Sequence, residues 1–217
     1  FIPATIGNVL FPTFVKQISN KNYDYISKNL NGIIYFIVLT LTPILVILLM
    51  GGHDIVDLLF GSKYKGAGTI LQIVSFGLIF HTFNNILGRL LYALNQEVYQ
   101  LKITIVALVL NIILNIILIP YFSYSGVAIS AISSFFLSFL LHFFRVKYLL
   151  KGIRIIIFKR VLNFVLYLLV SFLIFWGLSQ FIDSIIVKGL VLCFLHYCFV
   201  YIFELEVKNY IKQIFKI

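Results

Sequence analysis

The chain has 217 residues, of which 62% are hydrophobic and 11% are charged. Soluble globular domains have roughly 45–50% apolar and about 25% charged residues, so this composition excludes a soluble fold. The formal net charge of +10 does not indicate nucleic-acid binding, because the basic residues stand between long apolar runs and can set membrane topology instead. Since these runs lack the alternation of a closed barrel, the sequence predicts an integral membrane protein built from helices.

The N-terminal part of the chain predicts a partial span followed by a short surface helix. Residues 1–15 are apolar and are interrupted by Pro3 and Pro12. We expect them to be the end of a truncated transmembrane span, and the chain to be the C-terminal part of a longer membrane protein. Residues 16–29 are polar, with apolar side chains at helical spacing on one side, and predict a cytoplasmic amphipathic helix.

Residues 30–144 predict four transmembrane helices. The first covers residues 30–50, has a kink at Pro43 and ends at the Gly51–Gly52 pair. The second covers residues 67–95 and carries the largest number of polar side chains. It is longer than a bilayer requires, so we expect it to be tilted or to project from the membrane.

The third and fourth predicted helices form a hairpin over residues 101–144. Residues 103–119 carry no charge and are long enough to cross a hydrocarbon layer of ~30 Å at ~1.5 Å per residue. Pro120 ends this run because it has no N–H and disfavours helix at the residue before it. An uncharged hinge follows at 121–125, and Gly126 then opens a small-residue segment that lets another helix approach closely.

Positive charge divides the predicted loops between two sides of the membrane. A basic loop at 145–160 precedes two further spans within 161–203 and a cytoplasmic tail at 204–217. Alternation of sides then places 14 of the 17 Lys and Arg residues on one side and three on the other, which are Lys63, Lys65 and Lys188. Cytoplasmic loops carry the excess of Lys and Arg, so we expect that side, and the C-terminus, to be cytoplasmic.

Four sequence stretches follow one another in a characteristic order. They are VLFPTFVK at 9–16, LLFGSKYKGAG at 58–68 after a Pro-containing span, NILGRLLYALNQ at 85–96, and NIILNIILIPYFSYSGVAIS at 111–130. In this order they resemble the C-terminal lobe of the polysaccharide (oligosaccharidyl-lipid) flippases, within the multidrug/oligosaccharidyl-lipid/polysaccharide exporter superfamily. The chain departs from the family pattern at Ser123 and Ser125, which surround Tyr124 where a Gly is usual.

The resemblance implies an all-α, polytopic helix bundle that forms the second lobe of an exporter-type flippase. Two such lobes rock around a central cavity, and by alternating access they flip polyprenyl-pyrophosphate-linked oligosaccharide repeat units for O-antigen or capsule synthesis. The implied location is the bacterial inner membrane. The implied partners are the lipid-linked oligosaccharide, membrane lipids, the missing N-terminal lobe and polysaccharide polymerase machinery; no nucleic acid is expected.

Two alternative functions stay open. A cation-coupled multidrug exporter of the same superfamily requires acidic residues in its cavity, but all seven Asp and Glu residues fall in predicted loops or the tail. A membrane enzyme of glycan assembly would carry a large outer loop, and the expected outer loops are short. The sequence shows no nucleophile with a base, no metal-ligand spacing and no phosphate-binding Gly loop, so we expect no enzyme activity, catalytic residue, cofactor or metal.

The best candidates for substrate binding are His81, Asn85 and Arg89, which are four residues apart and share one face of a helix. On this face we expect Arg89 to bind a pyrophosphate through its planar guanidinium and His81 to serve proton coupling. Alternatively, Arg89 reaches lipid phosphate at the interface and His81 hydrogen-bonds to a neighbouring helix.

Asn111 and Asn115 share a face of the third predicted helix and are further candidates for the cavity. The other interpretation is that their amides hold helices together, since buried amides need partners. His142 lies near the end of a predicted span, and we assign it no role. Cys193 and Cys198 lie inside an apolar run and are interpreted as packing residues.

Overall fold

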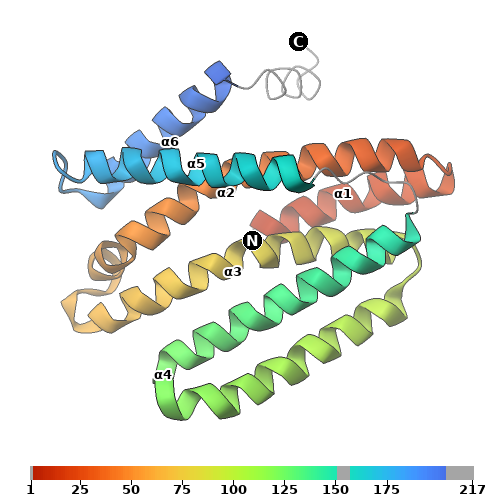
Figure 1. Cartoon of the computed structure of the whole chain (residues 1–217), viewed down its shortest axis with the longest axis horizontal. Coiled ribbons are helices and arrows are strands. Elements are labelled where there is room, and N and C mark those ends of the chain that lie inside the picture. Colours follow the sequence, from red (N-terminus) through yellow and green to blue (C-terminus); the bar gives the residue numbers. More distant parts are fainter. Residues whose placement is uncertain (1, 151–156, 204–217) are drawn as a thin grey trace. The chain divides into compact units, whose positions relative to one another are not determined.

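The computed structural model describes residues 2–150 and 157–203, and its regular elements within those ranges are helices (Figure 1). They are α1 (Ile2–Ser19), α2 (Tyr23–Phe60), the 3-10 helix η1 (Ser62–Tyr64), α3 (Lys65–Ala93), α4 (Glu97–Leu149), α5 (Ile157–Leu178) and α6 (Ile185–Phe203). The predicted all-α fold class is confirmed. The tail predicted at 204–217 and part of the basic loop, 151–156, lie outside the described residues.

Three helical segments of the described chain are long and apolar enough to cross a membrane. These segments are Gly32–Phe60, Gly66–Ala93 and Glu97–Leu149. Shorter apolar helical segments cover Val165–Leu178 and Ile185–Tyr201. A straight helix of 53 residues, the length of α4, would extend about 80 Å and far exceed a bilayer, so α4 must reverse direction.

The reversal in α4 lies at Ser123, whose backbone has φ 48° and ψ −127° and interrupts the helix. It divides α4 into two antiparallel arms joined by a tight bend (Figure 1). A Cβ at Gly126 would lie 2.7 Å from the carbonyl oxygen of Leu118, so only glycine lets the second arm begin this close to the first. The hairpin predicted around the uncharged hinge is confirmed.

The amphipathic helix predicted at 16–29 is wrong as a single element. α1 continues to Ser19, the chain turns, and α2 begins at Tyr23. Lys21 has a positive φ of 55°, and the side-chain oxygen of Asn22 accepts a hydrogen bond of 3.2 Å from the backbone N–H of Tyr25. Asn22 therefore caps α2, and the chain reverses inside the segment that was expected to be one helix.

The predicted end of the first complete span at Gly51–Gly52 is also wrong, because α2 continues to Phe60. Both glycines are buried. A Cβ at Gly51 would collide with the side chain of Ile185 at the start of α6 and would lie 3.7 Å from Phe175 of α5. The missing side chain thus serves close helix packing, which is the common use of glycine inside membrane helices.

The chain divides into two compact units. Unit 1 contains Phe1–Leu30 and Thr69–Ile155, and unit 2 contains Asn31–Gly68 and Ile156–Ile217. In unit 1, α3 packs against the second arm of α4 through aromatic rings, with Phe80 lying 5.1 Å from Phe136 between ring centroids. A Cβ at Gly77 would lie 3.3 Å from Phe135, so a small residue permits this approach.

Unit 2 has a dry core formed by α2, α5 and α6. One cluster joins Leu39, Tyr167 and Val200, one residue from each helix. A larger cluster contains buried apolar side chains of the same three helices: Val46, Phe175, Ile185 and Leu192. These clusters hold the three helices of unit 2 together through apolar contacts.

Candidate functional site

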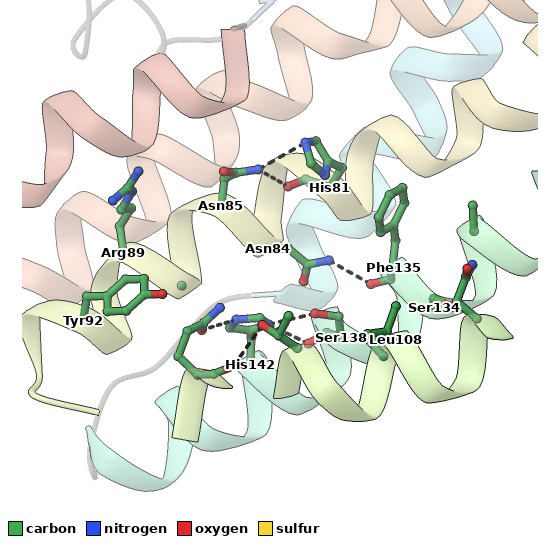
Figure 2. Close-up of a pocket in the computed structure, with 16 residues that line it drawn as sticks. His81, Asn84, Asn85, Arg89, Tyr92, Leu108, Ser134, Phe135, Ser138 and His142 are labelled. Atoms are coloured by element: carbon green, nitrogen blue, oxygen red, sulfur yellow. Dashed lines mark hydrogen bonds between the residues drawn. The ribbon is translucent and has the colours of Figure 1, made fainter. Parts of the chain in front are cut away.

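The cavity of unit 1 lies between α3 and both arms of α4 and has a volume of about 660 Å³ (Figure 2). Its wall combines polar side chains, small residues and a few apolar ones. The lining residues are His81, Asn84, Asn85, Gly88, Arg89, Tyr92, Gln100, Thr104, Ala107, Leu108, Asn111, Ala131, Ser134, Phe135, Ser138 and His142. The hairpin positions this wall, because its bend brings the polar residues of two sequence-distant arms opposite α3.

The predicted face of α3 forms one side of the cavity. His81, Asn85 and Arg89 all line it, and Figure 2 shows their side chains following one another along α3. The amide nitrogen of Asn85 donates to the carbonyl oxygen of His81 at 3.0 Å and lies 3.3 Å from Nε2 of the same residue. The His81 ring also lies 5.2 Å from the ring of Phe135 on α4.

Asn84 connects α3 to the second arm of α4. Its amide nitrogen donates a hydrogen bond of 2.9 Å to the backbone carbonyl of Phe135 (Figure 2). Its side-chain oxygen Oδ1 is buried and has no hydrogen-bond partner among the described residues. A buried amide oxygen without a partner is costly, so this atom is available to a donor that enters the cavity.

The two predicted asparagines of α4 have different positions. Asn111 lines the cavity and Asn115 is not among the lining residues. The amide nitrogen of Asn115 donates to Oδ1 of Asn111 at 3.0 Å, so this bond lies within one helix. The buried Oδ1 of Asn115 has no hydrogen-bond partner in the described part of the chain.

The sequence analysis missed the opposite wall, where His142 is 2% exposed. Nδ1 of His142 lies 2.7 Å from the carbonyl oxygen of Ser138, and Nε2 lies 2.6 Å from Oε1 of Gln100 on the first arm. A signal was present in the sequence, because a polar residue recurs every fourth position and keeps to one helix face. This buried stripe consists of Ser130, Ser134, Ser138 and His142.

The charge of the cavity is neutral to positive. Arg89 is its permanent cation, and none of the lining residues is Asp or Glu. The described residues also contain no group of three or more His, Cys, Asp or Glu placed to hold a metal ion. Amide and hydroxyl groups beside one guanidinium suit a ligand that is anionic and rich in hydroxyls.

The open end of the hairpin is held by Arg145. Its guanidinium donates a hydrogen bond of 2.5 Å to Oε1 of Gln96 and lies 4.2 Å from the ring centroid of Tyr99. The ring of Tyr148 lies 5.5 Å away on the other side. Arg145 therefore joins the two ends of α4 at the open end of the hairpin, away from the bend.

Fold and cavity together define a class: a multi-pass helical membrane protein with a polar, carboxylate-free cavity inside one helical unit. A family model described as "Lipid II flippase MurJ" matches residues 1–197, and the chain belongs to this family. The family is one of transporters, which confirms the expectation that the chain is not an enzyme. The expected superfamily is also confirmed.

Several relatives match this chain over much of its length. A probable lipid II flippase MurJ of Buchnera aphidicola subsp. Schizaphis graminum is 31% identical over 85% of this chain and 39% of its own length. An uncharacterised membrane protein of Methanocaldococcus jannaschii is 27% identical over 100% of this chain and 44% of its own. A probable low-salt glycan biosynthesis flippase of Haloferax volcanii is 33% identical over 63% of this chain and 29% of its own.

One solved structure has the same fold. It is a lipid II flippase MurJ in an inward closed conformation, with a TM-score of 0.70 and 22% sequence identity. The match covers 92% of this chain and 44% of that one. The chain therefore spans less than half the length of these relatives, and it corresponds to one part of a longer fold.

Proposed function

We propose that this chain is a lobe of a flippase that moves lipid-linked glycan precursors across a membrane. The observation that carries the proposal is the family match over residues 1–197, joined to a cavity that holds Arg89 and no carboxylate. A glycan joined to a pyrophosphate cannot cross hydrocarbon unaided, because removing its charges and hydroxyls from water costs too much free energy. A hydrated cavity that opens in turn to each side removes this barrier.

The cavity favours a glycan carrier over a drug cation. Arg89 offers a planar fork for pyrophosphate oxygens, and Asn85, Asn111 and Ser134 add hydrogen-bonding groups suited to sugar hydroxyls. A cation exporter would need a carboxylate in this position, and the lining has none. We infer that the ligand contacted here is the pyrophosphate with its first sugars, while the polyprenyl chain stays in lipid.

The finer proposal concerns the glycan itself. We propose an oligosaccharide repeat unit of a cell-surface polysaccharide, as the sequence predicts. A relative named as a capsular polysaccharide biosynthesis protein, from Staphylococcus aureus, supports it and is 31% identical over 44% of this chain. Lipid II is the second candidate, supported by the family match. Complementation of two strains, one lacking its lipid II flippase and one lacking its O-unit flippase, separates these substrates.

Photocrosslinking tests the cavity directly. A photoreactive amino acid at Leu108, which lines the cavity, should capture a lipid-linked pyrophosphate in membranes that contain the full chain. The matched control is Ile116, which lies on the same arm, is 70% exposed and does not line the cavity. Equal capture at both positions, or capture of lipid without pyrophosphate, would contradict the proposal.

The proposed orientation places the chain in the cytoplasmic membrane with its C-terminus inside. Cysteine labelling should then find position 63 accessible from the outside and positions 21, 151 and 212 accessible from the inside. If positions 63 and 151 label from the same side, the number of crossings between them is wrong.

A further inference from the structure

Nδ1 of His142 lies beside two oxygens of Ser138, the side-chain hydroxyl at 3.3 Å and the closer backbone carbonyl. It lies 2.7 Å from the carbonyl oxygen of Ser138, and a carbonyl can only accept a hydrogen bond. Nδ1 must therefore carry a hydrogen and donate it. In a neutral imidazole the other nitrogen, Nε2, is then a bare acceptor.

Nε2 of His142 faces the carboxamide of Gln100 at 2.6 Å from Oε1. Two acceptors cannot share a contact this short without a hydrogen between them. The contact is satisfied in two ways only. Either Nε2 gains a proton and the imidazolium donates to the amide oxygen, or the amide rotates by half a turn and its NH₂ donates to a neutral ring.

The slot around Gln100 accommodates both orientations of the amide. A Cβ placed on Gly88 would lie 3.4 Å from Oε1 and 3.4 Å from Nε2 of Gln100, and 3.5 Å from Nε2 of His142. Both ends of the carboxamide thus approach α3 equally closely, at a residue without a side chain. The half-turn exchanges two atoms of similar size and leaves the packing unchanged.

The two states present opposite groups from the same side chain. Gln100 and His142 both line the cavity, so the amide orientation decides which group of Gln100 is left free of His142 there. When His142 is protonated the amide turns its NH₂ outward, and the site gains a donor beside a positive ring. When His142 is neutral the amide turns its oxygen outward and repels an anion.

We propose that His142 and Gln100 form a proton-dependent anion-binding site, at which a phosphate or pyrophosphate group is bound together with one proton. This inference deepens the proposed function and rests on it for the identity of the anion. By linkage, an anion that prefers the protonated state must favour proton uptake, and proton uptake must tighten anion binding by the same factor. Binding therefore becomes weaker as pH rises.

Other charged and titratable groups around the cavity do not replace this pair. From α3, His81, Arg89 and Tyr92 line the cavity, and the first arm of α4 contributes none to the lining. On the second arm Arg145 follows His142, but its guanidinium is hydrogen-bonded at the end of the hairpin. Arg89 supplies constant positive charge, whereas protonation of His142 changes the group that Gln100 presents.

The test uses the full chain in lipid nanodiscs, with histidine ¹⁵N labels and inorganic pyrophosphate as the probe. The ¹⁵N shifts of His142 should show Nδ1 protonated throughout and Nε2 gaining a proton as pH falls. Pyrophosphate should raise the midpoint of this change. Its affinity should rise as pH falls, by at most about tenfold per pH unit for one coupled proton, until the ring is fully protonated.

Two variants separate the pair from its neighbours. Gln100→Glu offers only acceptor oxygens, so it should hold His142 charged and leave only the pH dependence that comes from the titration of pyrophosphate itself. His81→Gln keeps a hydrogen-bonding group without titration and should leave the pH dependence intact. Loss of the pH dependence in His81→Gln, or a midpoint of His142 that pyrophosphate does not move, would overturn the proposal.

Failure of this inference is distinguishable from failure of the proposed function. Crosslinking of a lipid-linked pyrophosphate at Leu108 that is equally strong at about pH 5.5 and at about pH 7.5 would retain the flippase and remove the proton-dependent site. Absence of crosslinking at both values, with the His142 titration shifted by pyrophosphate, would leave an anion site in a protein with another substrate.

Discussion

Each of the two compact units contains one buried histidine, and the two residues have different surroundings. His196 of unit 2 is 0% exposed and His142 of unit 1 is 2% exposed. Nε2 of His196 lies 3.2 Å from the carbonyl oxygen of Leu39, and its Nδ1 lies 2.8 Å from the hydroxyl of Ser171. One side chain of α6 thereby joins α2 and α5 inside the apolar core.

The chemistry of the partners explains the difference. A serine hydroxyl can donate, so Ser171 donates to Nδ1, Nε2 donates to Leu39, and a neutral His196 satisfies all three groups. Nδ1 of His142 lies 3.3 Å from the hydroxyl of Ser138 but only 2.7 Å from its carbonyl oxygen, to which it must donate. Nε2 then faces Oε1 of Gln100 and is satisfied by a proton or by rotation of the amide. Burial alone therefore does not separate a structural histidine from a functional one. The separation comes from whether the partners allow a second state.

The largest effect on stability is expected at His196, because its contrast with His142 assigns it a structural role. His196→Ala removes the ring from a closed core and leaves a cavity between α2, α5 and α6. It should cost about 3 kcal/mol of unfolding free energy. Thermal unfolding in nanodiscs measures it. Phe194→Ala on the lipid-facing side of the same helix, where the side chain is 67% exposed, is the matched control. Equal losses in both variants would contradict the structural role.

In the cavity we expect loss of transport with normal folding. Arg89→Ala should lower glycan translocation by about 10- to 100-fold, because a charge-assisted contact with the pyrophosphate is removed. Arg89→Lys keeps the charge without the planar fork and should retain part of the activity. Translocation is measured at equal protein levels in the membrane. Full activity of an Arg89→Ala, His81→Ala double variant would exclude this face of α3 from the substrate path.

Glycines of the two units should also differ, with the loss of stability now expected in unit 1. In Gly126→Ala the new Cβ meets the backbone of Leu118 at 2.7 Å, so the hairpin must open and unfolding free energy should fall by about 1–3 kcal/mol. A Cβ at Gly177 in α5 would meet no atom within 4 Å, and Gly177→Ala should be neutral or slightly stabilising. A smaller loss for Gly126→Ala than for Gly177→Ala would show that the arms do not approach this closely.

The smallest effect is expected at the bend, where Ser123 has φ 48°. Only glycine adopts this region freely, so Ser123→Gly should raise the unfolding free energy by about 1 kcal/mol. Ser125→Gly is the control, since Ser125 has no positive φ and its replacement should give no gain. Thermal unfolding of both variants checks the pair, and a gain at Ser125 alone would contradict the strain at Ser123.

The sequence predicted the parts of the fold that depend on local chemistry. The hairpin could be predicted because Pro120 and the uncharged hinge mark a reversal within an apolar run. The end of α2 could not, because Gly51 and Gly52 have the composition of a loop, whereas Gly51 serves packing against Ile185, more than 130 residues later. Helix boundaries that depend on a distant partner cannot be inferred from neighbouring residues.

The same reasoning applies to the cavity. His81, Asn85 and Arg89 could be identified because four-residue spacing places them on one face of α3. His142 was given no role because it lies near the end of a predicted span. Its partner Gln100 lies 42 residues away on the other arm, and only the folded hairpin brings the two together. The substrate-binding roles of His81, Asn85 and Arg89 stay predictions.

The bend at Ser123 also has a consequence for biogenesis. Among residues 97–122 only Ile103 is buried, so the first arm can partition into lipid on its own apolar surface as it leaves the ribosome. The second arm contains the stripe that ends at His142, and it finds hydrogen-bond partners on the first arm once both are in the bilayer. We therefore expect the arms to insert in chain order as a pair, with an uncharged hinge crossing the membrane at little cost.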